Sequence, residues 1–101
     1  MSFRRKIVGA LLQRQNLTPF ENAVLMNTFE IKRGRTLSYK ELAAKSGRPR
    51  AYRAVGNIMN KNPYPLLIPC HRVVASNNKL GGYAYGVGIK TLLLKAEGAK
   101  I

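Results

Sequence analysis

Two short patterns in this sequence determine where helices begin. Thr18-Pro19-Phe20-Glu21 and Ser38-Tyr39-Lys40-Glu41 each place a hydroxyl side chain three residues before a glutamate. In such a capping box, the hydroxyl and the carboxylate each accept a hydrogen bond from the other residue's backbone N–H. The first box predicts a helix whose apolar face includes Val24 and Leu25, and the second predicts a short helix through Ala44.

The short helix after Ser38 leads into another helix across a tight turn. Ser46-Gly47-Arg48-Pro49 ends the first helix, and residues 49–60 fit the second. Two short helices joined by a glycine-containing turn form the helix-turn-helix pattern, whose second helix enters a DNA groove. A plain helical hairpin packed in the core is the alternative interpretation.

Helices also fit the two ends of the chain. Apolar residues recur at helical spacing over 3–14, and residues 87–97 fit a last helix that Gly98 ends. The prolines of residues 62–65 exclude a helix there. We therefore expect a mainly α, small single domain with a winged helix-turn-helix-like core and a short β/loop wing. Between the helices we expect a buried extended segment at 66–69, a short strand at 73–75, a turn at 76–79 and a glycine-rich loop at 81–86.

Positive charge dominates the composition. Eighteen Lys and Arg residues stand against four acidic residues, which gives a formal net charge of +14. Solubility does not require so much charge, and a polyanion partner explains it. The basic residues are spread along the chain and do not line one face of a single helix, so nucleic acid is favoured over a membrane. A merely basic protein is the alternative.

The only cysteine and the only histidine of the chain are adjacent, in Pro69-Cys70-His71-Arg72. A thiol beside a titratable imidazole is a candidate nucleophile with a nearby base. A buried cysteine that acts as a small hydrophobic residue is the alternative. A single cysteine excludes an internal disulfide and a zinc cluster, and it favours the reducing cytoplasm. We expect no metal and no organic cofactor.

Taken in order, these pieces resemble the O6-alkylguanine-DNA alkyltransferases, also called methylated-DNA–protein-cysteine methyltransferases. The resemblance covers the chain from about Thr18 to Gly98. Its specificity comes from the order of the pieces around Pro-Cys-His-Arg. The matching elements are Thr18-Pro19-Phe20-Glu21, Ser38-Tyr39-Lys40-Glu41-Leu42-Ala43, Arg53-Ala54-Val55-Gly56, Asn62-Pro63-Tyr64-Pro65, Ile68-Pro69-Cys70-His71-Arg72-Val73, Gly82-Tyr83, Gly86 with Lys90, and Leu93-Leu94-Lys95-Ala96-Glu97-Gly98.

The resemblance implies direct repair of DNA by a protein that acts once. Members of the family move the alkyl group from the guanine O6 oxygen to one of their own cysteines as a permanent thioether. At the matching positions, Cys70 would be the acceptor, and His71 would draw off the thiol proton through a water molecule. Glu97 would orient and polarise His71, and Asn62 would support the turn that presents Cys70.

The resemblance also implies a set of contacts to DNA. Arg53 would enter the duplex and fill the gap left by the flipped base. Tyr39 would press the phosphate of the target nucleotide and hydrogen-bond the guanine ring. The backbone of Val73 and Ala84, in the loop with Tyr83, would contact the flipped base. The full expected set of DNA- and base-binding residues is Tyr39, Arg53, Ala54, Arg72, Val73, Tyr83 and Ala84.

Members of the family usually carry an N-terminal domain ahead of this region. We expect a compact version, with residues 1–17 as a basic helical extension and residues 18–101 as the alkyltransferase DNA-binding and active-site domain. Residues 3–14 are expected to pack on the surface that the other domain would cover. The expected partner of the monomer is double-stranded DNA containing O6-alkylguanine. The alternatives are a DNA-binding protein that senses alkylation damage without reacting, and a helix-turn-helix regulator with an inert thiol.

Overall fold

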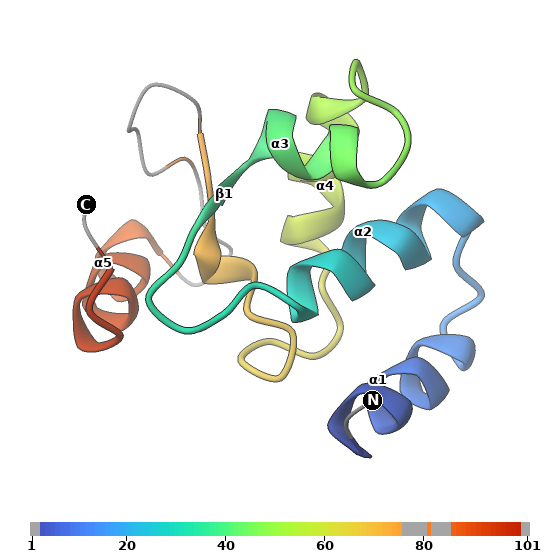
Figure 1. The fold of residues 1–101 in the computed structure, drawn as a ribbon, viewed down its shortest axis with the longest axis horizontal. Helices are drawn as coiled ribbons and strands as arrows, with labels where there is room; N and C mark the ends of the chain where they lie inside the picture. Colours follow the sequence, from blue (N-terminus) through green and yellow to red (C-terminus); the bar gives the residue numbers. More distant parts are fainter. Residues whose placement is uncertain (1–2, 76–80, 82–85, 100–101) are drawn as a thin grey trace.

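Helices make up about half of this chain (Figure 1). The computed structural model describes residues 3–75, 81 and 86–99. This architecture confirms the predicted mainly α class. In chain order the elements are α1 (Phe3–Gln13), α2 (Pro19–Phe29), β1 (Leu37–Ser38), α3 (Tyr39–Lys45), α4 (Tyr52–Asn60), the 3-10 helix η1 (Cys70–Arg72), β2 (Val73–Val74) and α5 (Val87–Ala96).

Both predicted capping boxes are present. The Thr18 hydroxyl accepts a hydrogen bond of 3.1 Å from the Glu21 N–H, and the Glu21 carboxylate accepts one of 2.9 Å from the Thr18 N–H. Ser38 and Glu41 make the same pair of bonds, at 3.0 and 2.9 Å. Because the boxes satisfy backbone donors at the helix ends, α2 and α3 begin where the sequence predicts.

The core lies around α2, α3 and α4, and the cysteine belongs to it. These three helices pack on one another, α1 packs on α2, and α5 packs on η1. Figure 1 shows α1 and α5 at opposite ends of the molecule. The buried apolar cluster consists of Val8, Leu12, Val24, Leu25, Ile31, Leu42, Ala43, Val55, Ile58, Met59, Ile68, Cys70 and Val73.

β1 and β2 form a parallel pair in which Leu37 aligns with Val73 and Ser38 with Val74. The β2 valines agree with the predicted short strand. Their partner β1 was not predicted, since two residues are too few for an alternating strand pattern to show. The pairing places Tyr39, the first residue of α3, beside the chain that leaves η1.

Residues 66–69 do not form the buried extended segment that we expected. Leu66 has a left-handed backbone, with φ +71°, and is 63% exposed. The Ile68 N–H donates a hydrogen bond of 2.8 Å to the Tyr64 carbonyl, so the chain turns sharply here. Ile68 itself is buried. The prediction fails because this turn, and not the apolar content of the run, sets the path of the chain.

The second helix of the helix-turn-helix begins later than expected. α4 starts at Tyr52 and not at residue 49. The Ala51 N–H donates a hydrogen bond of 3.0 Å to the Arg48 carbonyl, which closes a turn. The proline at position 49 therefore belongs to the turn that joins α3 to α4.

Part of the apolar face of α1 is buried. Val8 and Leu12 are buried in the core, whereas Phe3 is 77% exposed. The Tyr64 hydroxyl donates a hydrogen bond of 3.2 Å to the Leu11 carbonyl. α1 is therefore tied both to α2 and to the loop that leads to the cysteine.

Candidate active site

Cys70 is the first residue of η1 and is buried, with a free thiol and 3% exposure. Its N–H donates a hydrogen bond of 2.8 Å to the Ile68 carbonyl. Its own carbonyl accepts a hydrogen bond from the Val73 N–H. Backbone bonds on both sides therefore hold the cysteine on a fixed, buried turn.

The fold brings His71 and Glu97 together across 26 positions of the chain. Nε2 of His71 lies 3.0 Å from each oxygen of the Glu97 carboxylate. The other ring nitrogen, Nδ1, is buried. We assign the tautomer from this contact: when Nε2 carries the proton and donates to the carboxylate, Nδ1 carries the lone pair of the ring. In this tautomer His71 can act as a base through Nδ1.

Arg72 binds the same carboxylate. Its Nε and Nη2 donate to the two Glu97 oxygens at 2.9 and 2.6 Å, and its Nη1 donates to the Ile31 carbonyl at 2.8 Å. The structure thus places the guanidinium on the carboxylate that faces His71. The expected contact of Arg72 with DNA stays a prediction.

These contacts keep Glu97 ionised. The hydrogen bonds from the Arg72 guanidinium are the largest cause that lowers the pKa of the Glu97 carboxyl from 4.5 to about 2, against the opposing effect of burial. The hydrogen bond and charge of His71 act in the same direction as Arg72. Glu97 is therefore a fixed negative charge that can stabilise a positively charged imidazole.

Asn62 braces the loop that leads to the cysteine. Its Nδ2 donates a hydrogen bond of 2.8 Å to the Ile68 carbonyl, and its Oδ1 accepts one of 3.0 Å from the Tyr64 N–H. The same Ile68 carbonyl accepts the hydrogen bond from Cys70. This placement agrees with a role for Asn62 in supporting the turn.

The sequence predicted no role for Lys90, which is 0% exposed. Its Nζ donates a hydrogen bond of 2.6 Å to the carbonyl of Val73, one of the expected base contacts. The available signal was its spacing: Lys90 precedes the buried Leu94 by four positions, so the two share a face of α5.

Tyr39 approaches the start of the glycine-rich loop. A methyl group on Gly81 would lie 2.8 Å from the Tyr39 hydroxyl oxygen and 3.2 Å from the Ala75 nitrogen. Gly81 also has a φ of +73°, so both space and backbone favour glycine there. The expected base contacts Tyr83 and Ala84 lie outside the described residues.

Arg53 and Ala54 lie on the exposed side of α4. The opposite side of this helix buries Val55, Ile58 and Met59. α4 therefore presents Arg53 to solvent, as a helix that enters a DNA groove requires.

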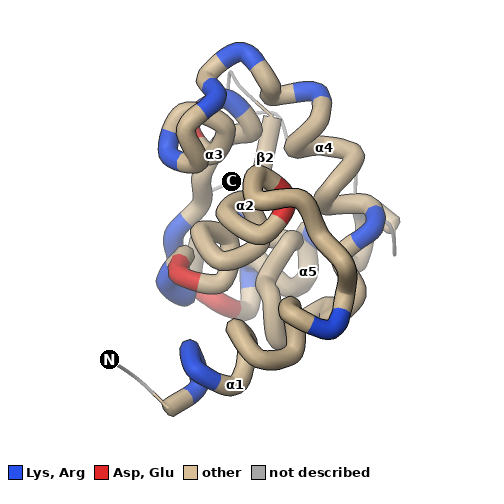
Figure 2. Tube along the Cα trace, turned by 90° about the vertical axis from the view of Figure 1, so that its right-hand side faces the viewer, with Lys and Arg blue, Asp and Glu red and all other residues tan. Residues whose placement is uncertain are grey.

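Exposed cations gather around the helix-turn-helix. Figure 2 shows several Lys and Arg positions on and around α3 and its connection to α4, at the top of the view. The exposed cations of this surface are Lys40, Lys45, Arg48, Arg50 and Arg53.

Within the described ranges, no helix is long and apolar enough to span a bilayer.

The four acidic side chains of the chain are all used within the fold. Glu21 and Glu41 cap helices, Glu30 pairs with Arg5, and Glu97 binds the groups described above. Because the acidic groups are used in this way, most of the excess positive charge remains available to bind a polyanion.

In the part of the chain that the structure describes, no three His, Cys or acidic side chains gather to hold a metal ion.

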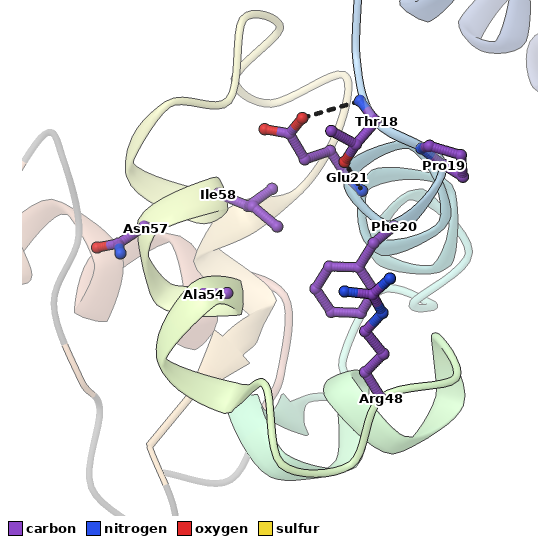
Figure 3. A pocket seen from close by; sticks show the side chains of 8 residues that line it. All are labelled: Thr18, Pro19, Phe20, Glu21, Arg48, Ala54, Asn57 and Ile58. Atoms are coloured by element: carbon purple, nitrogen blue, oxygen red, sulfur yellow. Dashed lines mark hydrogen bonds between the residues drawn. The ribbon is translucent and has the colours of Figure 1, made fainter.

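A hollow of about 410 Å³ opens between the start of α2 and α4 (Figure 3). The Arg48 guanidinium lies over the Phe20 ring, 5.4 Å from its centroid. Cys70 does not line it, so the hollow belongs to the helix-turn-helix surface and not to the reaction site. Its lining residues are Thr18, Pro19, Phe20, Glu21, Arg48, Ala54, Asn57 and Ile58.

Residues 19–99 match the family model described as 6-O-methylguanine DNA methyltransferase, DNA binding domain. Over 80 residues the chain is 52% identical to a methylated-DNA–protein-cysteine methyltransferase of Methanosarcina barkeri, which covers 79% of this chain and 51% of that relative. A similar protein of Homo sapiens with the same name is 49% identical over 71 residues, 70% of this chain and 34% of that relative. The chain spans about half the length, or less, of these curated relatives.

Solved structures agree with this match. Mycobacterium tuberculosis OGT in complex with DNA superposes with a TM-score of 0.78 at 40% identity, over 81% of this chain and 50% of that chain. S. pombe Atl1 in complex with damaged DNA containing O6-carboxymethylguanine superposes with a TM-score of 0.72 at 29% identity, over 85% of this chain and 82% of that chain.

Proposed function

Because this chain belongs to the family of the 6-O-methylguanine DNA methyltransferase DNA-binding domain, we propose that it repairs alkylated DNA directly. Cys70 takes the alkyl group from the O6 oxygen of guanine in double-stranded DNA and keeps it, so each molecule acts once. The observation that carries this proposal is the buried thiol next to a histidine whose ring is held by Glu97. The reaction as written uses no cofactor.

His71 supplies the basicity that the thiol needs. Only the thiolate is a good nucleophile. Nδ1 of His71 takes the thiol proton through a water molecule, and the Glu97 carboxylate stabilises the imidazolium that forms. Asn62 and η1 hold Cys70 in place meanwhile.

The thiolate then attacks the alkyl carbon. A sulfur–carbon bond forms, the carbon–O6 bond breaks, and its electron pair stays on the guanine. The Tyr39 hydroxyl donates a hydrogen bond to the guanine ring and stabilises the charge that develops there. The thioether on Cys70 cannot react again.

The target oxygen lies inside a stacked duplex, so the base must leave the stack at a cost of a few kcal/mol. Arg53 fills the gap and offsets part of this cost, and the small Ala54 lets α4 approach the DNA closely. Val73, Tyr83 and Ala84 contact the flipped base. The helix-turn-helix cations neutralise phosphates, which makes binding salt-dependent.

A protein that binds alkylation damage without reacting is the second candidate function. Its support is the similarity to S. pombe Atl1, over most of both chains, in a structure with damaged DNA. The cysteine in its motif favours the reactive function. For either function, the DNA partner and the single free thiol favour the cytoplasm as the compartment.

The deciding experiment is mass spectrometry of the protein after incubation with duplex DNA that carries one O6-methylguanine. We expect one added methyl group per molecule, on the peptide that contains Cys70. Unmodified duplex DNA and the Cys70→Ser variant are the controls, and neither should give the added mass. Lesion-selective binding without added mass would favour the second function, and absence of both would refute the proposal.

A further inference from the structure

A second hollow, of about 430 Å³, lies beside the cysteine turn. It opens between the start of α1, the end of α2 and the loop that leads to Pro69, and we call it the α1 hollow. None of its described lining residues belongs to α3 or α4. Figure 1 shows α3 at the top of the view and α1 at the bottom. The α1 hollow is therefore separate from the helix-turn-helix surface.

The α1 hollow carries an excess of positive charge. Its cations are Arg4, Lys32, Arg33 and Arg72. Glu30 also lines it, but this carboxylate forms an ion pair with Arg5. Glu97 neutralises Arg72, and the two remaining acidic residues of the chain cap helices. The other three cations of the hollow are thus left to attract a negatively charged ligand.

Apolar side chains share the α1 hollow with these cations. Phe29 and Leu67 line it and pack against the core, whereas Leu66 lines it and is 63% exposed. Ile7, 42% exposed, follows Arg4 by three positions, so the two share a side of α1. An exposed apolar patch with a polar rim marks an interaction site, whereas single exposed apolar residues do not.

The backbone of Leu66 points the same way. Its φ of +71° lies in the left-handed region, which glycine and asparagine adopt more readily than leucine. Burial of the side chain does not repay this strain, because Leu66 is exposed. Strain at an exposed residue is a reason to look for a contact outside the chain.

We propose that the α1 hollow is a docking site for an acidic segment of a partner protein, whose apolar side chain covers Leu66 while its carboxylates face Arg4 and Lys32. Nucleic acid fits this site less well, because a phosphate backbone offers no apolar group to Leu66 and Ile7. A second copy of this chain is repelled by the net charge of +14. An acidic and apolar segment matches both the charge and the exposed side chains.

The α1 hollow also borders the reacting pair. Pro69 precedes Cys70, and Arg72 follows His71 and holds Glu97. A docked segment contacts the chain on both sides of this pair and leaves the cations of α3 and α4 open to DNA. The inference therefore goes beyond the repair reaction and does not depend on it.

The test uses two fluorescein-labelled peptides with the same number of glutamates. Leucines alternate with the glutamates in one peptide and serines in the other, and fluorescence anisotropy measures the affinity of each. We expect the leucine peptide to bind about tenfold more tightly, the effect of covering one large apolar side chain. Equal affinity of the two peptides, or no binding of the leucine peptide, overturns the proposal.

Leu66→Asn tests the apolar contact. Asparagine tolerates the left-handed backbone, so the turn is kept while the apolar side chain is lost. The leucine peptide should bind this variant about tenfold more weakly. Leu92→Asn is the matched control, since Leu92 is a leucine of α5 that is 69% exposed, and it should bind like the wild type. Equal effects of the two substitutions contradict the proposed site.

Lys32→Gln tests the charge and covers the case in which Leu66→Asn does not fold. Lys32 is exposed, so its replacement leaves the core intact. We expect about threefold weaker binding of the leucine peptide, and a smaller loss in high salt. Lys45→Gln removes an exposed lysine of α3 and should change nothing. If Lys45→Gln weakens binding as much as Lys32→Gln, the peptide is held by net charge and not by this site.

NMR shift mapping on the isotope-labelled wild-type protein locates the bound peptide. The leucine peptide should shift the signals of α1, Lys32 and Leu66, and a short unmodified duplex should shift those of α3 and α4. Peptide shifts confined to α3 and α4 overturn the proposal. Duplex shifts centred on the α1 hollow also overturn it, because nucleic acid would then be the occupant. None of these measurements uses alkylated DNA, so their outcome is independent of methyl transfer.

Discussion

Replacing Glu97 by glutamine should lower the free energy of unfolding at neutral pH, and this loss should shrink as the solution becomes acidic. Glu97 is 13% exposed at its side chain and contacts both Arg72 and His71. Its pKa falls from 4.5 to about 2, chiefly through the Arg72 hydrogen bonds. Each pKa unit corresponds to about 1.4 kcal/mol, so the ionised carboxylate contributes about 3 kcal/mol to the free energy of unfolding at pH 7.

The sign of the pH dependence follows from the lowered pKa. The contribution is complete above the unfolded-state value of 4.5, and it is lost as the pH falls through the folded-state value of about 2. By pH 3, about 2 of the 3 kcal/mol should be gone. The difference in the free energy of unfolding between the wild type and Glu97→Gln should therefore be about 2 kcal/mol smaller at pH 3 than at pH 7.

Urea unfolding of both proteins at several pH values between 3 and 7 measures this difference. Urea is preferred to guanidinium chloride because a salt screens ion pairs. Glu41→Gln, which removes an exposed capping carboxylate, controls for the change in net charge. A difference between wild type and Glu97→Gln that is the same at pH 3 and pH 7 would refute the reasoning.

Two other substitutions test how the site is held. Tyr64→Phe removes the hydrogen bonds of the hydroxyl with Gln15 and Leu11, which are 2.9 and 3.2 Å long. Chemical denaturation should show a free energy of unfolding that is lower by about 1 kcal/mol. A loss near zero would contradict the idea that this hydroxyl anchors α1. Gly81→Ala puts a methyl group against the Tyr39 hydroxyl at a position whose φ is +73°. The substitution should lower the melting temperature and slow methyl transfer. An unchanged rate of transfer would contradict the idea that the reaction depends on the position of the Tyr39 hydroxyl.

Much of the candidate site followed from the family resemblance and not from local pattern. The adjacency of Cys70 and His71 is visible in the sequence, and the resemblance added Glu97, which the fold does bring to His71. The resemblance placed Arg72 on DNA, whereas the structure engages it with Glu97. Lys90 was among the residues that match the family, but its burial was not predicted, because a lysine in a helix is ordinarily expected at the surface.

The starts of α2 and α3 and the turn at Gly98 were readable because each depends on hydrogen bonds between residues three to five positions apart. The nearest neighbours in the chain are enough to decide such contacts. The pairing of β1 with β2 and the burial of Lys90 depend on segments that only packing brings together. Their free energy comes from long-range burial and from satisfying buried polar groups, so the tertiary structure alone decides them.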